Sequence, residues 1–162
     1  MATLVRSLIF SLIVPLTVAV LIPRYLLPHY YINCGMWSFR ISLVIMAIAL
    51  LVYLWCVLAF VVQGKGTPAV WFTKKLSFLL GEEPQKTVTG GLYKLSRNPM
   101  YLSVCLFIIG LAYFEENLFI FIYALVVFAF FHWVVVKFEE PHLKKKFGEE
   151  YFSYIKKSRR WL

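Results

Sequence analysis

The sequence predicts an all-α integral membrane protein with about four transmembrane helices. Hydrophobic residues make up 61% of the 162-residue chain, and the mean hydropathy is +0.75. Soluble domains are only about half apolar, so this composition lies outside their range. Lys and Arg fall almost entirely between or after four apolar segments, which are the expected spans: 4–22, 41–62, 101–114 and 118–136.

The basic residues predict which side of the membrane each loop occupies. With the N-terminus inside, 15 of the 17 Lys and Arg residues lie on one side, and only Arg24 and Arg40 on the other. The positive-inside rule then places both termini and the loop 63–97 in the cytosol. We therefore expect the net charge of +9 to attract anionic lipid headgroups rather than nucleic acid.

Residues 1–62 are expected to anchor the chain in the membrane. Arg6 before an apolar run is typical of a secretory signal, but no small-residue cleavage site follows, so we expect a retained helix, kinked at Pro15. The aromatic segment 27–40 fits the outer interface, and segment 41–62 contains no charge.

Residues 63–162 form the more polar part of the chain, which begins with glycine-bearing turns. The two glycines and the proline of 63–68 allow a sharp turn or a close approach to a ligand, although a simple helix stop would use the same residues. Segment 71–80 mixes aromatic residues with lysines and suits the membrane interface. The pair Gly90-Gly91 permits a loop around a small ligand, or again a simple turn.

The stretch Arg97-Asn98-Pro99-Met100-Tyr101 predicts a helix N-terminus at the membrane surface. Asn98 can accept hydrogen bonds from the first backbone N–H groups, and Pro99 suits the first turn. Such an end carries unpaired N–H groups and a partial positive charge. It can therefore hold a carboxylate or a phosphate.

The last two spans are expected to form a helical hairpin over 99–138, because only the turn 115–117 separates them. At 1.5 Å per residue, Tyr101 and Glu139 lie about 20 Å and about 33 Å from that turn. The two side chains thus reach similar depths, to within about two helical turns. One polar pocket could use both.

Other ionisable or reactive side chains are few in the expected spans. His132 is the one ionisable residue of the last span and a candidate catalytic residue; a neutral imidazole bonded to a neighbouring helix is the alternative. The spacing of Cys34, Cys56 and Cys105 indicates neither a disulfide framework nor a metal site.

The tail 139–162 is charged and patterned, with a second helix expected after Gly148. We expect an amphipathic lid over the cytosolic mouth of the hairpin, closing a cofactor pocket; a tail lying on anionic lipid is the alternative. The apolar positions that support a patterned tail are Phe138, Leu143, Phe147, Tyr151, Tyr154 and Ile155.

In their order along the chain, these motifs resemble the isoprenylcysteine carboxyl methyltransferase and phospholipid methyltransferase superfamily. The resemblance covers about residues 63–161. It rests on Gln63-Gly64-x-Gly66-Thr67-Pro68, Val88-Thr89-Gly90-Gly91-Leu92-Tyr93, Arg97-Asn98-Pro99-Met100-Tyr101, Gly110, Glu139-Glu140-Pro141-x-Leu143, Phe147-Gly148-Glu149-Glu150-Tyr151-x-x-Tyr154 and Arg159-Arg160-Trp161.

The resemblance implies an integral membrane enzyme that takes S-adenosyl-L-methionine from the cytosol and a lipophilic acceptor from the bilayer. Residues 63–162 would form the catalytic region, and no metal is implied. By matching positions, the cofactor pocket would use Gln85, Lys86, Thr87, Val88, Tyr93, Asn98, Pro99, Met100, Tyr101 and Glu139. If the acceptor needs a base, the candidates are Glu140, Tyr101, His142 and, less directly, His132.

One departure from the superfamily bears on the acceptor. Isoprenylcysteine enzymes carry an arginine one helical turn before the first glutamate of the pair, and here that position is Val135. A prenylcysteine carboxylate would lose its charge partner, for which His132 and Arg97 are the candidate substitutes. The acceptors therefore rank as phospholipid amine, then prenylcysteine carboxylate, then small thiol, while a small transporter or a lipid-binding scaffold is the non-enzymatic alternative.

Overall fold

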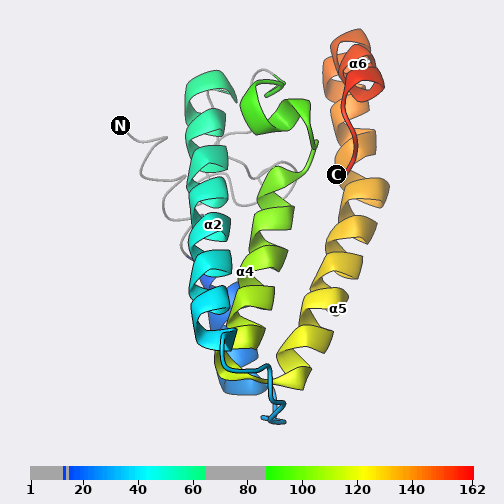
Figure 1. The fold of residues 1–162 in the computed structure, drawn as a ribbon. Coiled ribbons are helices and arrows are strands. Elements are labelled where there is room, and N and C mark those ends of the chain that lie inside the picture. Colours follow the sequence, from blue (N-terminus) through cyan, green and yellow to red (C-terminus); the bar gives the residue numbers. More distant parts are fainter. Residues whose placement is uncertain (1–12, 14, 65–86) are drawn as a thin grey trace.

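The computed structural model describes residues 13, 15–64 and 87–162, and this part of the chain is helical without strands (Figure 1). The helix α4 (Pro99–Glu115) is central. It packs against α2 (Ser38–Ala59), α5 (Leu118–Val134) and the π-helix η1 (Thr17–Leu26). The predicted all-α class is thus confirmed for the described part, whereas most of the first expected span and residues 65–86 lie outside it.

The predicted hairpin is present. Glu116 adopts a left-handed conformation with φ of 47° and ends α4, and the Asn117 side chain accepts a hydrogen bond of 3.0 Å from the Phe119 N–H to begin α5. Past the turn of η4 (Val135–Glu139), the chain continues directly into α6 (Glu140–Lys157). Gly148, with φ of 51°, breaks α6 where the sequence predicts the second tail helix to begin.

The α2–α4 contact is close because small residues lie in it. A Cβ atom on Gly110 would come within 2.6 Å of the Met46 side chain and 3.2 Å of its backbone nitrogen. Ser42, Ala49 and Ala112 are also buried. Small residues at this contact let the two backbones approach, as is common between membrane helices.

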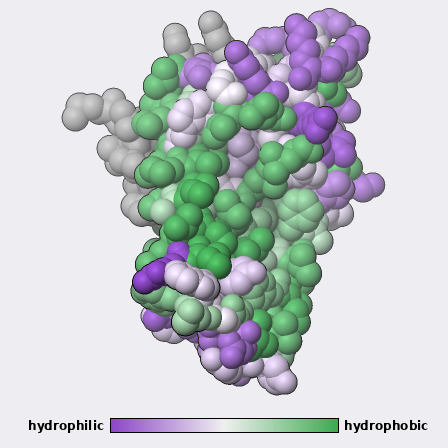
Figure 2. Space-filling model, in the orientation of Figure 1, coloured by the Kyte–Doolittle hydropathy of each residue, from purple (hydrophilic) through white to green (hydrophobic). Residues whose placement is uncertain are grey.

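Among the described residues, two helices are long and apolar enough to cross a membrane: Ser38–Gln63, and Leu118–Lys157 through its apolar first half. Only 22% and 28% of their apolar windows are buried. Figure 2 shows hydrophobic surface over the middle of the molecule and hydrophilic residues gathered at the α6 end. An apolar belt of this size would be unfavourable in water and indicates a membrane protein.

Candidate active site

The loop before α4 is held against α2 by a glycine that no other residue could replace without movement. Gly91 has φ of 57°, and a Cβ atom there would lie 2.0 Å from the Trp55 ring. This close approach lets Tyr93 of the 3-10 helix η3 (Gly91–Lys94) stack on Trp55, with ring centroids 6.3 Å apart. Tyr93 is thereby fixed beneath the tail, where its carbonyl accepts a 2.6 Å hydrogen bond from the Tyr154 hydroxyl.

Helix α4 begins at Pro99 as predicted, but the expected cap is not formed. Asn98 occupies the N-cap position without a side-chain hydrogen bond to the helix backbone. Its Nδ2 instead donates to the Arg160 carbonyl over 2.8 Å. The cap prediction is wrong because the tail brings a backbone acceptor to Asn98, and that distant partner cannot be seen in local sequence.

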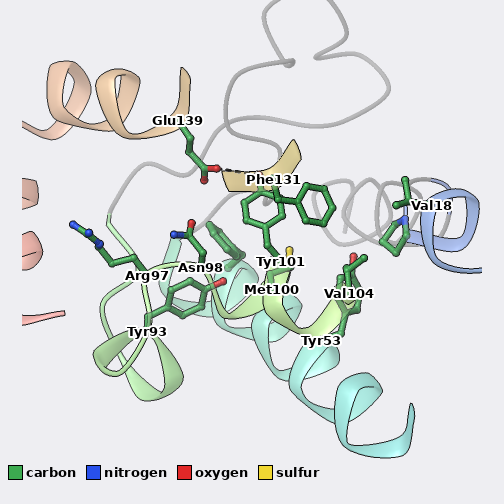
Figure 3. Close-up of a pocket in the computed structure, with 12 residues that line it drawn as sticks. Val18, Tyr53, Tyr93, Arg97, Asn98, Met100, Tyr101, Val104, Phe131 and Glu139 are labelled. Atoms are coloured by element: carbon green, nitrogen blue, oxygen red, sulfur yellow. Dashed lines mark hydrogen bonds between the residues drawn. The ribbon is translucent and has the colours of Figure 1, made fainter. Parts of the chain in front are cut away.

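The two hairpin arms bring together the residues for which a shared pocket was predicted. The Tyr101 hydroxyl donates to Glu139 Oε2 over 2.9 Å (Figure 3). Glu139 lies beyond the apolar segment, which ends at Val136, but it is only 9% exposed. Burial raises the pKa of Glu139 to about 7; the Tyr101 hydrogen bond opposes this shift and the charge of Glu140 adds to it. An ionised Glu139 would therefore be stabilised by a cation in the cavity.

Glu140 is committed to ion pairs. Arg160 contacts it through two nitrogens at 2.8 and 3.0 Å, and Arg97 Nη2 lies 3.4 Å from its Oε1. Burial would raise the pKa of Glu140, but the Arg160 hydrogen bonds and the charges of Arg97, Arg160 and Lys144 outweigh it and lower the pKa. This carboxylate secures the tail and stays ionised, which makes it a weak base.

The chain end lies along the loop that precedes α4. Ser96 and Arg159 form an isolated parallel bridge, in which the Arg97 N–H donates to the Arg159 carbonyl over 2.8 Å. The Trp161 indole donates to His132 Nδ1 over 3.0 Å. His132 thus has a structural partner and lies outside both cavities described next, so the structure does not bring it to the other candidate residues.

Two cavities with shared lining residues lie at this point, and Figure 3 shows the first of them. The first cavity lies between η1, α2, α4 and α5. Apart from the residues that it shares with the second cavity, its lining is mostly apolar: Pro15, Val18, Tyr53, Met100, Tyr101, Val104 and Phe131. The second lies beneath α6 and is lined by Thr87, Val88, Val135, Glu140, Leu143, Phe147, Tyr151 and Tyr154. Both are lined by Phe60, Tyr93, Arg97, Asn98 and Glu139.

Two buried polar groups at the second cavity have unsatisfied hydrogen-bonding atoms. Thr87 Oγ1 and the Nε and Nη1 atoms of Arg97 have no hydrogen-bond partner among the residues that the structure describes. A buried group left in this state costs about 1–3 kcal/mol. Arg97 was absent from the predicted cofactor residues and was considered only as a substitute charge partner for a substrate carboxylate. Its place directly before Asn98-Pro99, at the start of α4, was the available signal.

Most predicted cofactor residues lie on these walls. Met100 and Tyr101 line the first cavity, Thr87 and Val88 line the second, and Tyr93, Asn98 and Glu139 line both. Pro99 is buried in the first turn of α4 and lines neither. Gln85 and Lys86 lie outside the described residues. In the described ranges, no group of three His, Cys, Asp or Glu residues could hold a metal ion.

A comparison with protein families agrees with the resemblance that the sequence motifs indicated. The phospholipid methyltransferase family profile matches residues 37–150, which is more than half of the chain. The match includes α2, the hairpin and most of α6, and so most of both cavity walls. No curated protein and no solved structure gave a significant match. The chain therefore belongs to the phospholipid methyltransferase family of membrane methyltransferases, as its motifs suggested.

Proposed function

We propose that this protein uses S-adenosyl-L-methionine to methylate a lipophilic acceptor at the cytosolic face of the membrane. The observation that carries the proposal is the meeting, at Glu139, of a mostly apolar cavity between the helices and a second cavity beneath α6 that adds Thr87 and Glu140 to its lining; Tyr101 in the first cavity is hydrogen-bonded to Glu139. Such an arrangement suits a reaction between a water-soluble donor and a bilayer-dissolved acceptor. The donor would occupy the cavity beneath α6, and the acceptor would enter between the helices.

The residues present fit the cofactor. Its sulfonium supplies a methyl carbon that is already electrophilic, so the protein needs mainly to align the reactants and exclude water. Buried Glu139, with its raised pKa, favours a cationic ligand. Tyr93, Thr87 and Val88 would hold the uncharged parts, and the tail would close the cavity as a lid.

A phospholipid amine remains the first-ranked acceptor. Val135 is fully buried and lines the cavity beneath α6, so the position where isoprenylcysteine enzymes have arginine offers no charge to a carboxylate. Among the candidate catalytic groups, Tyr101 lines the acceptor cavity, and we propose it as the residue that contacts the reacting atoms. Its partner Glu139 could accept the proton that an amine releases.

The charge distribution supports a topology for this proposal. Residues 1–62 would anchor the chain, and 63–162 would carry out catalysis. Four helices would span or enter the bilayer, with both termini and the active site in the cytosol. The hydrophilic α6 end in Figure 2 would then face the cytosol and contact anionic headgroups.

Calorimetric binding of S-adenosylhomocysteine to the purified protein tests the proposal. We expect saturable binding in the wild type and at least a tenfold loss in Glu139→Gln. Glu149→Gln is the matched control, because Glu149 is an exposed α6 carboxylate outside both cavities. Equal binding by all three proteins would show that Glu139 does not hold the cofactor, and no binding by folded wild type would favour the transporter or scaffold alternative. A panel of phospholipid amines, prenylcysteines and thiols would then identify the acceptor.

A further inference from the structure

We propose that Arg97 is the centre of an oxyanion-binding subsite, with the Thr87 hydroxyl on the same cavity wall. The subsite takes a carboxylate or phosphate group from one of the two reactants. This inference rests on the proposed function, because it assigns one charged group of the cofactor or of a phospholipid acceptor to a specific side chain.

The first argument is the unmet bonding capacity of Arg97. Its side chain is only 9% exposed and lines both cavities. Nε and Nη1 are buried without a hydrogen-bond partner in the described part of the chain. A guanidinium is always charged and donates through five N–H groups, so it suits a buried oxyanion better than any neutral ligand.

The second argument is that Arg97 is not needed to hold the tail in place. Arg160 already holds Glu140 through two short contacts of 2.8 and 3.0 Å, while Arg97 reaches the same carboxylate at 3.4 Å. Figure 3 shows that the Arg97 side chain does not point at Tyr101, and Glu139 is hydrogen-bonded to Tyr101 instead. Arg97 therefore has no short ionic contact of its own among the described residues.

The third argument is charge balance. Two guanidinium groups, those of Arg97 and Arg160, share the single carboxylate of Glu140. An added anion beside Arg97 would balance the second positive charge in a site where water does not screen it well. Thr87 Oγ1, buried and without a partner in the described residues, can donate to the same anion.

The test compares ligands with and without the anionic group. Binding of S-adenosylhomocysteine and of its descarboxy analogue is measured by calorimetry for wild type, Arg97→Gln, Arg97→Lys and Arg160→Gln. A carboxylate subsite predicts that wild type prefers the carboxylated ligand about tenfold or more, that Arg97→Gln loses this preference and that Arg97→Lys keeps part of it. Arg160→Gln, which also removes a Glu140 partner, should keep the preference even if both affinities fall.

The second arm tests phosphate as the source. Short-chain phosphatidylethanolamine and a phosphate-free long-chain alkylamine are bound to the same four proteins. If Arg97 holds the lipid phosphate, Arg97→Gln loses the preference for the phospholipid while its preference between the two nucleosides is unchanged. If Arg97→Gln keeps both wild-type preferences, the subsite is overturned. Wild type that fails to bind the nucleosides would instead refute the proposed cofactor, and the lipid arm would still decide the role of Arg97.

Discussion

At the scale of single residues, the protonation of Glu139 makes a prediction about ligand binding. With a pKa of about 7, Glu139 is near half protonation at neutral pH in the free protein. A cationic ligand in the cavity lowers that pKa, so binding of S-adenosyl-L-methionine should release up to about half a proton at pH 7 and more at pH 6, and affinity should rise between pH 6 and pH 8. Calorimetry in two buffers of different ionisation enthalpy measures the release.

Glu139→Gln should abolish this proton release, since an amide cannot titrate. Glu150→Gln is the control, because Glu150 is exposed and lies outside the two cavities that meet at Glu139. A wild-type binding enthalpy that does not depend on the buffer would contradict the prediction.

Two glycines with a positive φ give a second residue-scale prediction. Gly91 and Gly148 have φ of 57° and 51°, but only at Gly91 would a Cβ atom meet another side chain, Trp55. Gly148 has φ of 51° and ψ of −126°, a conformation that residues with a Cβ atom rarely adopt, so alanine there should cost about 1–3 kcal/mol. Alanine at Gly91 should cost about 1–3 kcal/mol more, because Trp55 or the loop must move.

Thermal unfolding in detergent measures the two effects, and the midpoint should fall further for Gly91→Ala. S-adenosylhomocysteine affinity should also fall there, since Tyr93 stacks on Trp55. Equal midpoints for the two variants would show that the loop does not depend on the close approach of Gly91 to Trp55.

At the scale of elements, the tail is fastened by Arg160 rather than by tail charge in general. Arg160→Gln removes two hydrogen bonds to a buried carboxylate and should lower the free energy of unfolding by about 1–3 kcal/mol, since Arg160 is partly exposed. Arg159→Gln removes the same charge from an exposed side chain next to it and should change stability by less than about 0.5 kcal/mol. Limited proteolysis of the tail, alongside thermal unfolding, separates the two variants; equal protection would contradict the role of Arg160.

Local sequence predicted the hairpin well and the tail contacts poorly. The turn at 115–117 and the rise of a helix were enough to bring Tyr101 and Glu139 to one level. The glycine at position 148 likewise predicted the break in the tail helix. The π-helical segments were not predicted, because the apolar pattern does not distinguish their hydrogen bonding from that of an α-helix.

Contacts between distant segments could not be read from the sequence. Asn98 bonds to Arg160, and His132 to Trp161, across 62 and 29 residues. No periodicity or motif specifies such pairs, so the cap at Asn98 was mispredicted. The unsatisfied donors of Arg97 also became visible only once its surroundings were known.

At the scale of the whole molecule, the natural cysteines report on membrane orientation. Cys34 is partly exposed in the segment between η1 and α2, while Cys56 and Cys105 are buried. A membrane-impermeant maleimide should therefore label Cys34 in right-side-out vesicles and not in sealed inside-out vesicles. Burial and the charge of Glu116 raise the pKa of Cys34, so labelling is best done near pH 8.5.

Cys34→Ser should remove that label, and Glu149→Cys on the Cys34→Ser background should label only from the opposite side. Labelling of Cys34 from the α6 side would reverse the proposed topology. The same vesicles can be used to ask from which side S-adenosylhomocysteine binds.

The hairpin geometry also limits which insertions and deletions the protein tolerates. Tyr101 and Glu139 sit on opposite arms and are joined by a bond of 2.9 Å. Inserting or deleting one residue between either partner and the turn at Glu116 would shift that partner by about 1.5 Å and rotate it by about 100° about its helix. Either change exceeds what a hydrogen bond allows, so these two arms can exchange many apolar residues but cannot gain or lose one.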